Sequence, residues 1–148
     1  MKAEIHNLEK RFLDEIDIIE KASFKYPWSK EAYLQEIENP NAIYKVITLD
    51  NEVIAYGGFH QVFDEGHVTN IAVKESFRKK GFGKMLMDAL IEETKEKDII
   101  SMTLEVRVSN INAVKLYENL GFKSAGVRPK YYPDGEDAFI MWLEDISN

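Results

Sequence analysis

Apolar residues in the first forty positions recur at helical spacing. They return every three residues from 13 to 19 and predict a helix that continues to Phe24. Tyr26-Pro27-Trp28 interrupts this pattern, and Ser29 is placed to cap a second, shorter helix. Asn39-Pro40 ends that helix, because a residue before proline is disfavoured in helical conformation. The chain therefore opens with two short helices.

From residue 43 the pattern changes to short apolar runs separated by turn residues, which is typical of strands. The turns are expected at Asp50-Asn51 and around Asp64-Glu65-Gly66. Three strands, predicted to form an antiparallel meander, cover residues 43–49, 53–62 and 68–73.

The second half alternates between helical and strand patterns. It predicts a helix from Lys84 to about Lys97, a strand over 101–108, a helix from about Asn112 to Leu120 closed by Gly121, and a strand over 138–143. An antiparallel half followed by βαβα units indicates an α/β (α+β) fold with a mixed sheet and helices on its faces.

The strand at 101–108 has one apolar and one polar face, since side chains alternate along a strand. Ser101, Thr103, Glu105 and Arg107 share the polar face. A strand reached through a crossover helix usually lies inside a sheet and is apolar on both faces. The polar face thus indicates a wet cleft lined by Glu105. The alternative is an edge strand with a solvated face.

A basic, glycine-containing loop joins the strand Asn70–Val73 to the next helix. Gly81 and Gly83 let the backbone approach a ligand, and cations surround them: Arg78, Lys79, Lys80 and Lys84. The first N–H groups of a helix have no partner inside it and carry partial positive charge. This arrangement favours a pyrophosphate. An ordinary basic turn before a helix is the alternative, and the loop matches neither a Walker nor a Rossmann motif.

Composition narrows the class of protein. A chain of 148 residues with a formal charge of −7 and no cysteine is expected to form one domain, 1–148, without a disulfide, a thiolate metal site or a cysteine nucleophile. The negative charge argues against direct binding to nucleic acid. The absence of a membrane-length apolar run or a signal peptide predicts a cytoplasmic protein without a membrane partner.

Several motifs together resemble the GCN5-related N-acetyltransferase (GNAT) superfamily, and within it the bacterial RimI-type branch, which acetylates the N-terminal alanine of a small-subunit ribosomal protein. The resemblance covers residues 26 to 143. It rests on Pro27-Trp28-Ser29, Asn70–Val73, Arg78-x-x-Gly81-x-Gly83, Leu104–Arg107 with Ser109-Asn110, Leu116–Glu118, Gly121-Phe122, Tyr131–Pro133 and Glu136–Ala138.

The resemblance implies a GNAT fold with a sheet of about six to seven strands and helices on both faces, and acetyl-CoA as co-substrate without a metal. Glu105 looks like the family's proton acceptor and Tyr117 like its proton donor. The implied cofactor-binding residues are Ile71, Ala72, Val73, Arg78, Lys79, Lys80, Gly81, Phe82, Gly83, Lys84 and Asn110. From its position alone, Asn110 is also a helix N-cap and Tyr117 also a packing aromatic.

The implied partner is a protein or peptide N-terminus, as found on a ribosomal protein. Trp28, Tyr131 and Tyr132 are candidates for the walls of a peptide groove, and each is equally compatible with the core. The charge of Asp134, Glu136 and Asp137 is suited to attract a basic tail, or belongs to a solvated turn. The oligomeric state stays open, and a monomer is compatible with everything above.

Without cysteine, direct attack by the amine in a ternary complex is favoured over an acetyl-enzyme. Two alternatives remain open at this point. One is an acetyltransferase with broad specificity for N-termini or small amines, and the other is a non-catalytic domain that binds acyl-CoA.

Overall fold

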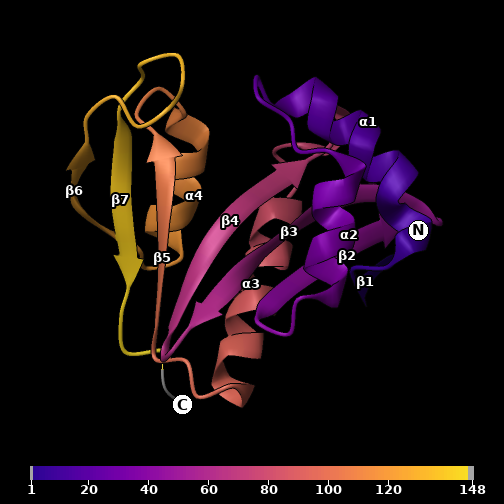
Figure 1. Cartoon of the computed structure of the whole chain (residues 1–148), viewed down its shortest axis with the longest axis horizontal. Helices are drawn as coiled ribbons and strands as arrows, with labels where there is room; N and C mark the ends of the chain where they lie inside the picture. The colour runs from indigo at the N-terminus through magenta and orange to yellow at the C-terminus, as the bar shows by residue number, and fades with distance from the viewer. Residues whose placement is uncertain (1, 147–148) are drawn as a thin grey trace.

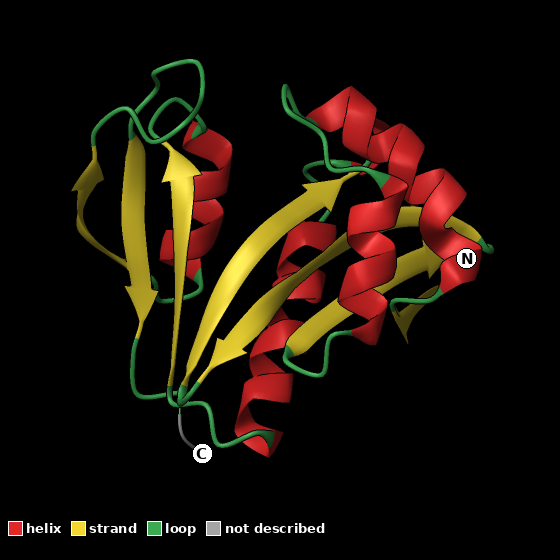
Figure 2. Cartoon of the chain, in the orientation of Figure 1, coloured by secondary structure: helices red, strands yellow, loops and turns green. Residues whose placement is uncertain are grey.

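The computed structural model describes residues 2–146, so residues 1, 147 and 148 of the domain expected over 1–148 lie outside the described part. The described part forms one seven-stranded sheet with four α-helices (Figures 1 and 2). The helices are α1 (Leu13–Ser23), α2 (Lys30–Glu38), α3 (Phe82–Glu96) and α4 (Ile111–Asn119). The strands are β1 (Ala3–Asn7), β2 (Ala42–Leu49), β3 (Glu52–Val62), β4 (Glu65–Val73), β5 (Ser101–Arg107), β6 (Lys123–Arg128) and β7 (Ala138–Leu143). Single 3₁₀ turns precede α1 and follow β4.

The strand order β1-β2-β3-β4-β5-β7-β6 makes a mixed sheet. β1 to β4 are antiparallel neighbours, which confirms the predicted meander. β4 and β5 are parallel, and β5, β7 and β6 are again antiparallel. β5 thus lies inside the sheet, so the edge-strand alternative for residues 101–108 is wrong. None of the helices in residues 2–146 has the length and apolar character that crossing a membrane requires.

The sequence pattern missed β1 and β6, the two edge strands. All six residues of β6 are exposed, so it carries no alternation of apolar and polar positions to detect. The turn between β3 and β4 is also tighter than expected. Glu65 and Gly66, predicted as turn residues, already pair with β3, and Phe63 turns the chain with a φ of +56°.

Helices cover both faces of the sheet, as predicted (Figure 2). α1 and α2 pack on one face, where their apolar residues contact Tyr44, Val46 and Tyr56 of β2 and β3. α3 and α4 contribute to the larger core on the opposite face, which contains Leu86, Leu90 and Tyr117. The two cores hold the sheet rigid between them, so side chains at its centre are placed precisely relative to one another.

β4 and β5 pair only at their first residues, Glu65–His67 with Ser101–Thr103. Beyond this point the two strands diverge like the arms of a V (Figure 1). β4 continues along β3, and β5 continues along β7. The V opens a cleft in the middle of the sheet, toward the carboxyl ends of both strands, where functional sites of open sheets are found.

Candidate active site

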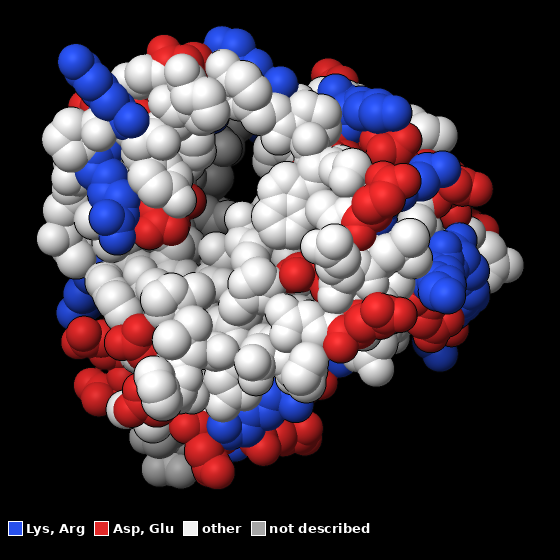
Figure 3. Space-filling model, in the orientation of Figure 1, with Lys and Arg blue, Asp and Glu red and all other residues white. Residues whose placement is uncertain are grey.

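The cleft between β4 and β5 has two adjoining compartments. The front compartment, of about 340 Å³, contains Trp28, Asn70, Glu105 and Tyr132 in its walls. The loop compartment, of about 550 Å³, lies against the basic loop before α3. Figure 3 shows a hollow between the two halves of the molecule, walled largely by uncharged atoms. The residues shared by both compartments are Ser23, Phe24, Ile71, Asn110, Ala113 and Tyr117. A molecule in one compartment can therefore meet a molecule in the other.

The loop compartment is built to accept an anion. α3 begins directly after Gly81, so the unpaired N–H groups and the positive dipole end of its first turn lie at the compartment. Four cationic side chains line the same compartment: Arg78, Lys79, Lys84 and Lys115. In a chain of net charge −7 this is a local positive site, and its donors fit a pyrophosphate.

Arg78 connects two other residues that line the loop compartment, Val73 and Ser23. Its Nε donates to the carbonyl of Val73 at 2.9 Å, and its guanidinium reaches Ser23 Oγ at 3.4 Å. Two of the residues assigned to cofactor binding from the sequence do not line the cleft. Lys80 lies over the ring of Phe77, with its Nζ 5.8 Å from the centroid, and Phe82 packs edge-on against the same ring. Both side chains thus help fold the loop behind the compartment.

The two glycines of the loop serve different purposes. Gly81 has a φ of +88°, and no other atom lies within 4 Å of the position that a Cβ would occupy there. Its backbone conformation therefore favours glycine, while the space beside it is open. At Gly83 a Cβ would come within 3.1 Å of Leu116 Cδ2 on α4. Gly83 lines the loop compartment, and its missing side chain also allows α3 and α4 to approach each other there.

The edge of β4 that faces β5 supplies main-chain groups to the cleft. Beyond His67 this edge pairs with no strand in the described part of the chain, so alternate peptide groups of residues 68–73 point into the gap. Ile71, Ala72 and Val73, which the resemblance assigns to cofactor binding, all line the loop compartment. The carbonyl of Val73 accepts from Arg78 Nε, and the other main-chain groups that face the gap are placed to bind a linear ligand or stabilise an oxyanion.

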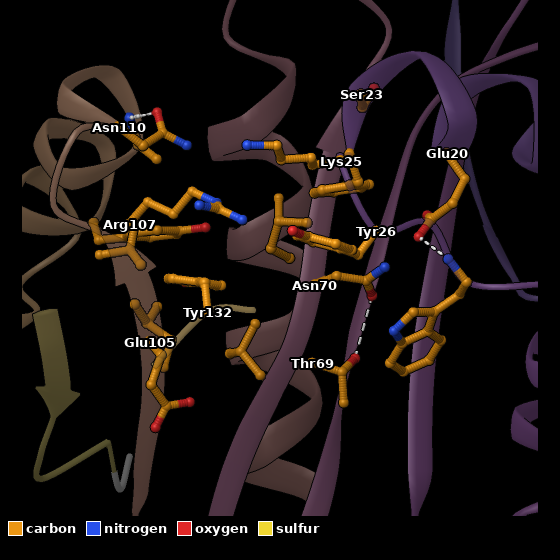
Figure 4. A pocket seen from close by; sticks show the side chains of 18 of the residues that line it. Glu20, Ser23, Lys25, Tyr26, Thr69, Asn70, Glu105, Arg107, Asn110 and Tyr132 are labelled. Carbon is orange, nitrogen blue, oxygen red and sulfur yellow. Dashed lines mark hydrogen bonds between the residues drawn. The ribbon is translucent and has the colours of Figure 1, made fainter. Parts of the chain in front are cut away.

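Glu105 projects from β5 into the front compartment, opposite Thr69 and Asn70 on β4 (Figure 4). Its side chain is 24% exposed, and its Oε2 lies 3.4 Å from Nε of Arg128. Arg128 lies on β6 and pairs with Ala138 of β7, which in turn pairs with Arg107 of β5. The small side chain of Ala138 leaves Arg128 room to reach across β7 to Glu105.

Tyr117 lies where the two compartments meet. Its ring packs edge-on against Phe122, with centroids 5.8 Å apart, and only 7% of the residue is exposed. Burial raises the pKa of the Tyr117 hydroxyl well above its ordinary range, so the group stays protonated at neutral pH. Tyr117 therefore packs in the core and also lines both compartments, where a protonated hydroxyl is available.

Asn110 is both the N-cap of α4 and a residue of the cleft wall. Its Oδ1 accepts from the backbone N–H of Ala113 at 3.2 Å, which caps α4, and the residue lines both compartments (Figure 4). Cap and cleft contact coexist because the cap uses the oxygen and leaves the Nδ2 donors for other partners.

The three aromatic candidates for a peptide groove differ in position. Trp28 and Tyr132 line the front compartment, and both are half-buried. Tyr131 does not line it; this residue is 49% exposed and packs edge-on against Tyr132 at 5.0 Å. The Arg107 guanidinium lies over the other ring, 4.0 Å from the centroid of Tyr132. Burial raises the pKa of Tyr132 to about 12.

Comparison with known proteins agrees with this geometry. The profile of the acetyltransferase (GNAT) family matches residues 13–122. The chain belongs to this family. It is 42% identical over 144 residues, 96% of this chain and 95% of the relative, to the putative [ribosomal protein bS18]-alanine N-acetyltransferase of Bacillus subtilis.

Solved structures of acetyltransferases have the same fold. The ribosomal-protein-S18-alanine N-acetyltransferase of Escherichia coli superimposes with a TM-score of 0.89 at 35% identity, covering 99% of this chain and 96% of that one. The PaiA N-acetyltransferase of Thermoplasma acidophilum, solved in complex with coenzyme A, has a TM-score of 0.84 at 21% identity, covering 97% of this chain and 99% of that one. The expected GNAT fold is thus confirmed.

The acidic residues Asp134, Glu136 and Asp137 of this acetyltransferase stabilise the loop between β6 and β7. Asp134 Oδ2 accepts from Arg107 at 2.9 Å and from Lys25 at 3.2 Å, and Glu136 Oε1 accepts from Arg107 at 2.8 Å. The backbone N–H of Glu136, which donates to Asp134, and the two cations lower the pKa of Asp134 to about 2. These carboxylates are paired and form an organised turn.

Some residues of the acetyltransferase site were not found from the sequence. Lys115 and Asn112 line the loop compartment, and their spacing of three on α4 puts them on one helical face, which is a usable signal. Arg107 was placed on the polar face of its strand but given no role. Glu20 interrupts the apolar face of α1, and a carboxylate at such a position is the signal that was overlooked.

Proposed function

We propose that this acetyltransferase transfers the acetyl group of acetyl-CoA to the α-amino group of the N-terminal alanine of ribosomal protein bS18, in the cytoplasm. The observation that carries the proposal is that Glu105 and Tyr117, from β5 and α4, line one cleft beside an anion site. The substrate is taken from the relatives in B. subtilis and E. coli, which match this chain over nearly its whole length and whose names state it.

Acetyl-CoA supplies an acetyl thioester whose carbonyl accepts an amine nucleophile. The loop compartment fits the charged part of this molecule, with the first turn of α3, Arg78, Lys79, Lys84 and Lys115 as ligands for its phosphates. The open edge of β4 at residues 71–73 supplies main-chain groups for its linear arm. The thioester then lies near Tyr117, where the two compartments meet.

The front compartment holds the peptide, with its amine near Glu105. As the new N–C bond forms, the carboxylate of Glu105 takes the proton that the nitrogen loses, directly or through a water. A main-chain N–H of β4 stabilises the oxyanion. As the C–S bond breaks, the hydroxyl of Tyr117 gives a proton to the departing sulfur. Attack is direct, in a ternary complex, because the chain has no cysteine to carry the acetyl group.

An α-amine is the easier nucleophile for this set of residues. At pH 7 an α-amino group with a pKa near 7.7–8.0 is about one-tenth neutral, whereas a lysine near 10.4 is neutral in less than one molecule in a thousand. A single carboxylate is therefore adequate for the α-amine.

The test is acetyl-CoA-dependent release of free thiol with two short peptides. One peptide begins with alanine and has a free α-amine; the matched peptide has a blocked α-amine and a free lysine. Turnover with the first alone supports the proposal. Turnover with both indicates the broad acetyltransferase instead, and acetyl-CoA binding without turnover of either contradicts the proposal and favours a non-catalytic domain.

A further inference from the structure

Glu20 is a carboxylate buried in the wall of the front compartment, with 1% of the residue exposed. It lies on α1 and accepts three hydrogen bonds. The hydroxyls of Tyr33 and Tyr56 donate to Oε1 at 2.7 and 2.6 Å, and the backbone N–H of Trp28 donates to Oε2 at 2.9 Å. Figure 4 shows the bond from the Trp28 backbone beside the other residues of the compartment.

The three donors come from different parts of the fold. Trp28 belongs to the segment between α1 and α2, Tyr33 to α2 and Tyr56 to β3. The Tyr33 hydroxyl in turn accepts from Nδ2 of Asn70 on β4. One carboxylate thus links Trp28 and Asn70, two residues that line the front compartment.

All three groups that bind Glu20 are donors, and all are neutral. Burying a carboxylate without a cation is costly, and only hydrogen bonds to both of its oxygens offset that cost. A neutral amide has only one acceptor end, so in Glu20→Gln the end facing the Trp28 N–H carries donors whenever the other end accepts from the tyrosines. The site therefore favours a side chain that accepts hydrogen bonds at both of its terminal atoms, as a carboxylate does.

The bond to Trp28 helps to fix the segment between α1 and α2. Residues 24–29 carry Phe24, Tyr26 and Trp28 into the wall of the front compartment. The Trp28 ring is held by Tyr33, 5.4 Å away between centroids, which itself packs edge-on against Tyr44 and Tyr56. The same tyrosine that positions the ring is hydrogen-bonded to Glu20.

We propose that Glu20 is a positioning residue for the acceptor peptide: through Trp28 and, by way of Tyr33, Asn70, it sets the width of the front compartment. This inference rests on the proposed function, since it assigns the front compartment to the peptide. Glu20 acts through its neighbours and touches no reacting atom. Loss of the Glu20 carboxylate should therefore weaken binding of the peptide and leave binding of acetyl-CoA, which binds in the other compartment, unchanged.

The test is Glu20→Gln in the full chain, in a Trp142→Phe background that leaves Trp28 as the single tryptophan. We expect KM for the N-terminal alanine peptide to rise about tenfold, since one buried donor is left unpaired. KM for acetyl-CoA should change by less than about twofold. The emission of Trp28 should shift to the red and become more accessible to acrylamide.

The matched control is Glu15→Gln. Glu15 is also a carboxylate of α1 that binds a backbone N–H, that of Val53 at 3.0 Å, but this is the one hydrogen bond its carboxylate accepts within the described residues. An amide can turn its oxygen to that donor, so this variant should match the parent in peptide KM and in Trp28 emission.

Two results would overturn the proposal. One is a Glu20→Gln protein with the parent's peptide KM and Trp28 emission. The other is an equal loss of affinity for peptide and acetyl-CoA, which a merely structural role would give. If Glu20→Gln does not fold, Tyr33→Phe is the second variant, because it removes the hydroxyl between Glu20 and Asn70 and keeps the ring. Tyr33→Phe should also raise the KM for the peptide and leave the KM for acetyl-CoA nearly unchanged. An unchanged peptide KM in this variant contradicts the proposal.

The readouts also separate this proposal from the proposed function. If the parent protein does not turn over the alanine peptide, the substrate assignment fails, but Trp28 emission and acetyl-CoA affinity can still be measured. A red shift in Glu20→Gln with unchanged acetyl-CoA affinity then supports the positioning of Trp28 by Glu20. Unchanged emission contradicts it.

Discussion

Arg128 pairs with Glu105 across an intervening strand, with Nε and Oε2 3.4 Å apart. Arg128 is a half-exposed side chain of β6, the edge strand, and Glu105 is the carboxylate of β5 that faces the cleft. The candidate base is therefore already in contact with a cation before a cationic amine arrives. The two cations compete for the same carboxylate.

Removing the positive charge of Arg128 should strengthen binding of the peptide amine at Glu105. We expect Arg128→Gln to lower the KM for the N-terminal alanine peptide by up to about fivefold, since a half-exposed ion pair is worth about 0.2–1 kcal/mol. The gain should shrink at high salt, which screens the pair. Steady-state kinetics at two salt concentrations measures both effects. Lys123→Gln, on the same strand, is the control, and an equal gain in that variant points to net charge as the cause.

Glu105→Gln keeps the shape of the side chain and removes its capacity to accept a proton. We expect kcat to fall by about 10²–10⁴-fold, the usual contribution of a general base. The affinity for acetyl-CoA should stay close to that of the parent, because Glu105 does not line the loop compartment. Thiol-release kinetics gives kcat, and calorimetry gives the affinity for acetyl-CoA. Normal turnover in this variant would remove Glu105 from its role.

Tyr117→Phe should keep the packing against Phe122 and lose the proton donor. We expect kcat to fall by about 10²-fold or more with little change in melting temperature. Burial raises the pKa of Tyr117, so its hydroxyl remains protonated up to that raised value. The parent's kcat should therefore show no decline from Tyr117 ionisation at pH values below about 10, the ordinary pKa of tyrosine. A decline below that pH which Tyr117→Phe abolishes would contradict this assignment.

Gly83→Ala should disturb the wall of the loop compartment. Its Cβ would come within 3.1 Å of Leu116 Cδ2, so the Leu116 side chain in the compartment wall must move to make room for it. We expect the Kd for acetyl-CoA to rise about tenfold, since overpacking costs about 1–3 kcal/mol. Leu116→Ala in the same chain removes the contact, so the double variant should recover part of the affinity. No recovery would mean that Gly83 acts in another way.

Asp134→Asn tests the loop between β6 and β7. The pKa of Asp134 is lowered to about 2 in the folded protein, so its stabilising effect is present above the unfolded value of about 3.9 and is lost as the pH falls through about 2. The parent should melt at a higher temperature than Asp134→Asn above about pH 4. The difference should disappear toward about pH 2. A difference that is constant over this range would show that ionisation of Asp134 is not the cause.

The sequence was most informative where local pattern and tertiary structure agree. Ser29 caps α2 and Gly121 ends α4 with a φ of +103°, both as predicted, because capping depends on neighbouring residues. The five strands with longer apolar runs, β2, β3, β4, β5 and β7, were also found. β6 was missed because an exposed edge strand gains its stability from backbone pairing with β7, which leaves no pattern in its side chains.

The site was only partly predictable for a related reason. Residues 78–84 and Glu105 stand in recognisable local motifs. The bond between Glu20 and Tyr56 joins residues 36 positions apart, and that between Arg107 and Asp134 joins residues 27 apart. Such partners depend on which strands become neighbours, and that is decided by the whole sheet. Lys80 and Phe82 show the converse, since they share a loop with cleft residues and turn behind it.

The divergence of β4 and β5 leaves this sheet unfinished at its centre. β2, β3 and β7 each have a neighbour on both sides for most of their length, whereas within the described chain β4 beyond His67 and β5 beyond Thr103 have one. A linear molecule with amide groups that enters the gap can take the place of the missing strand. Docking and completion of the sheet are then one event, and the bound ligand adds main-chain hydrogen bonds at the middle of the sheet and stabilises the folded protein.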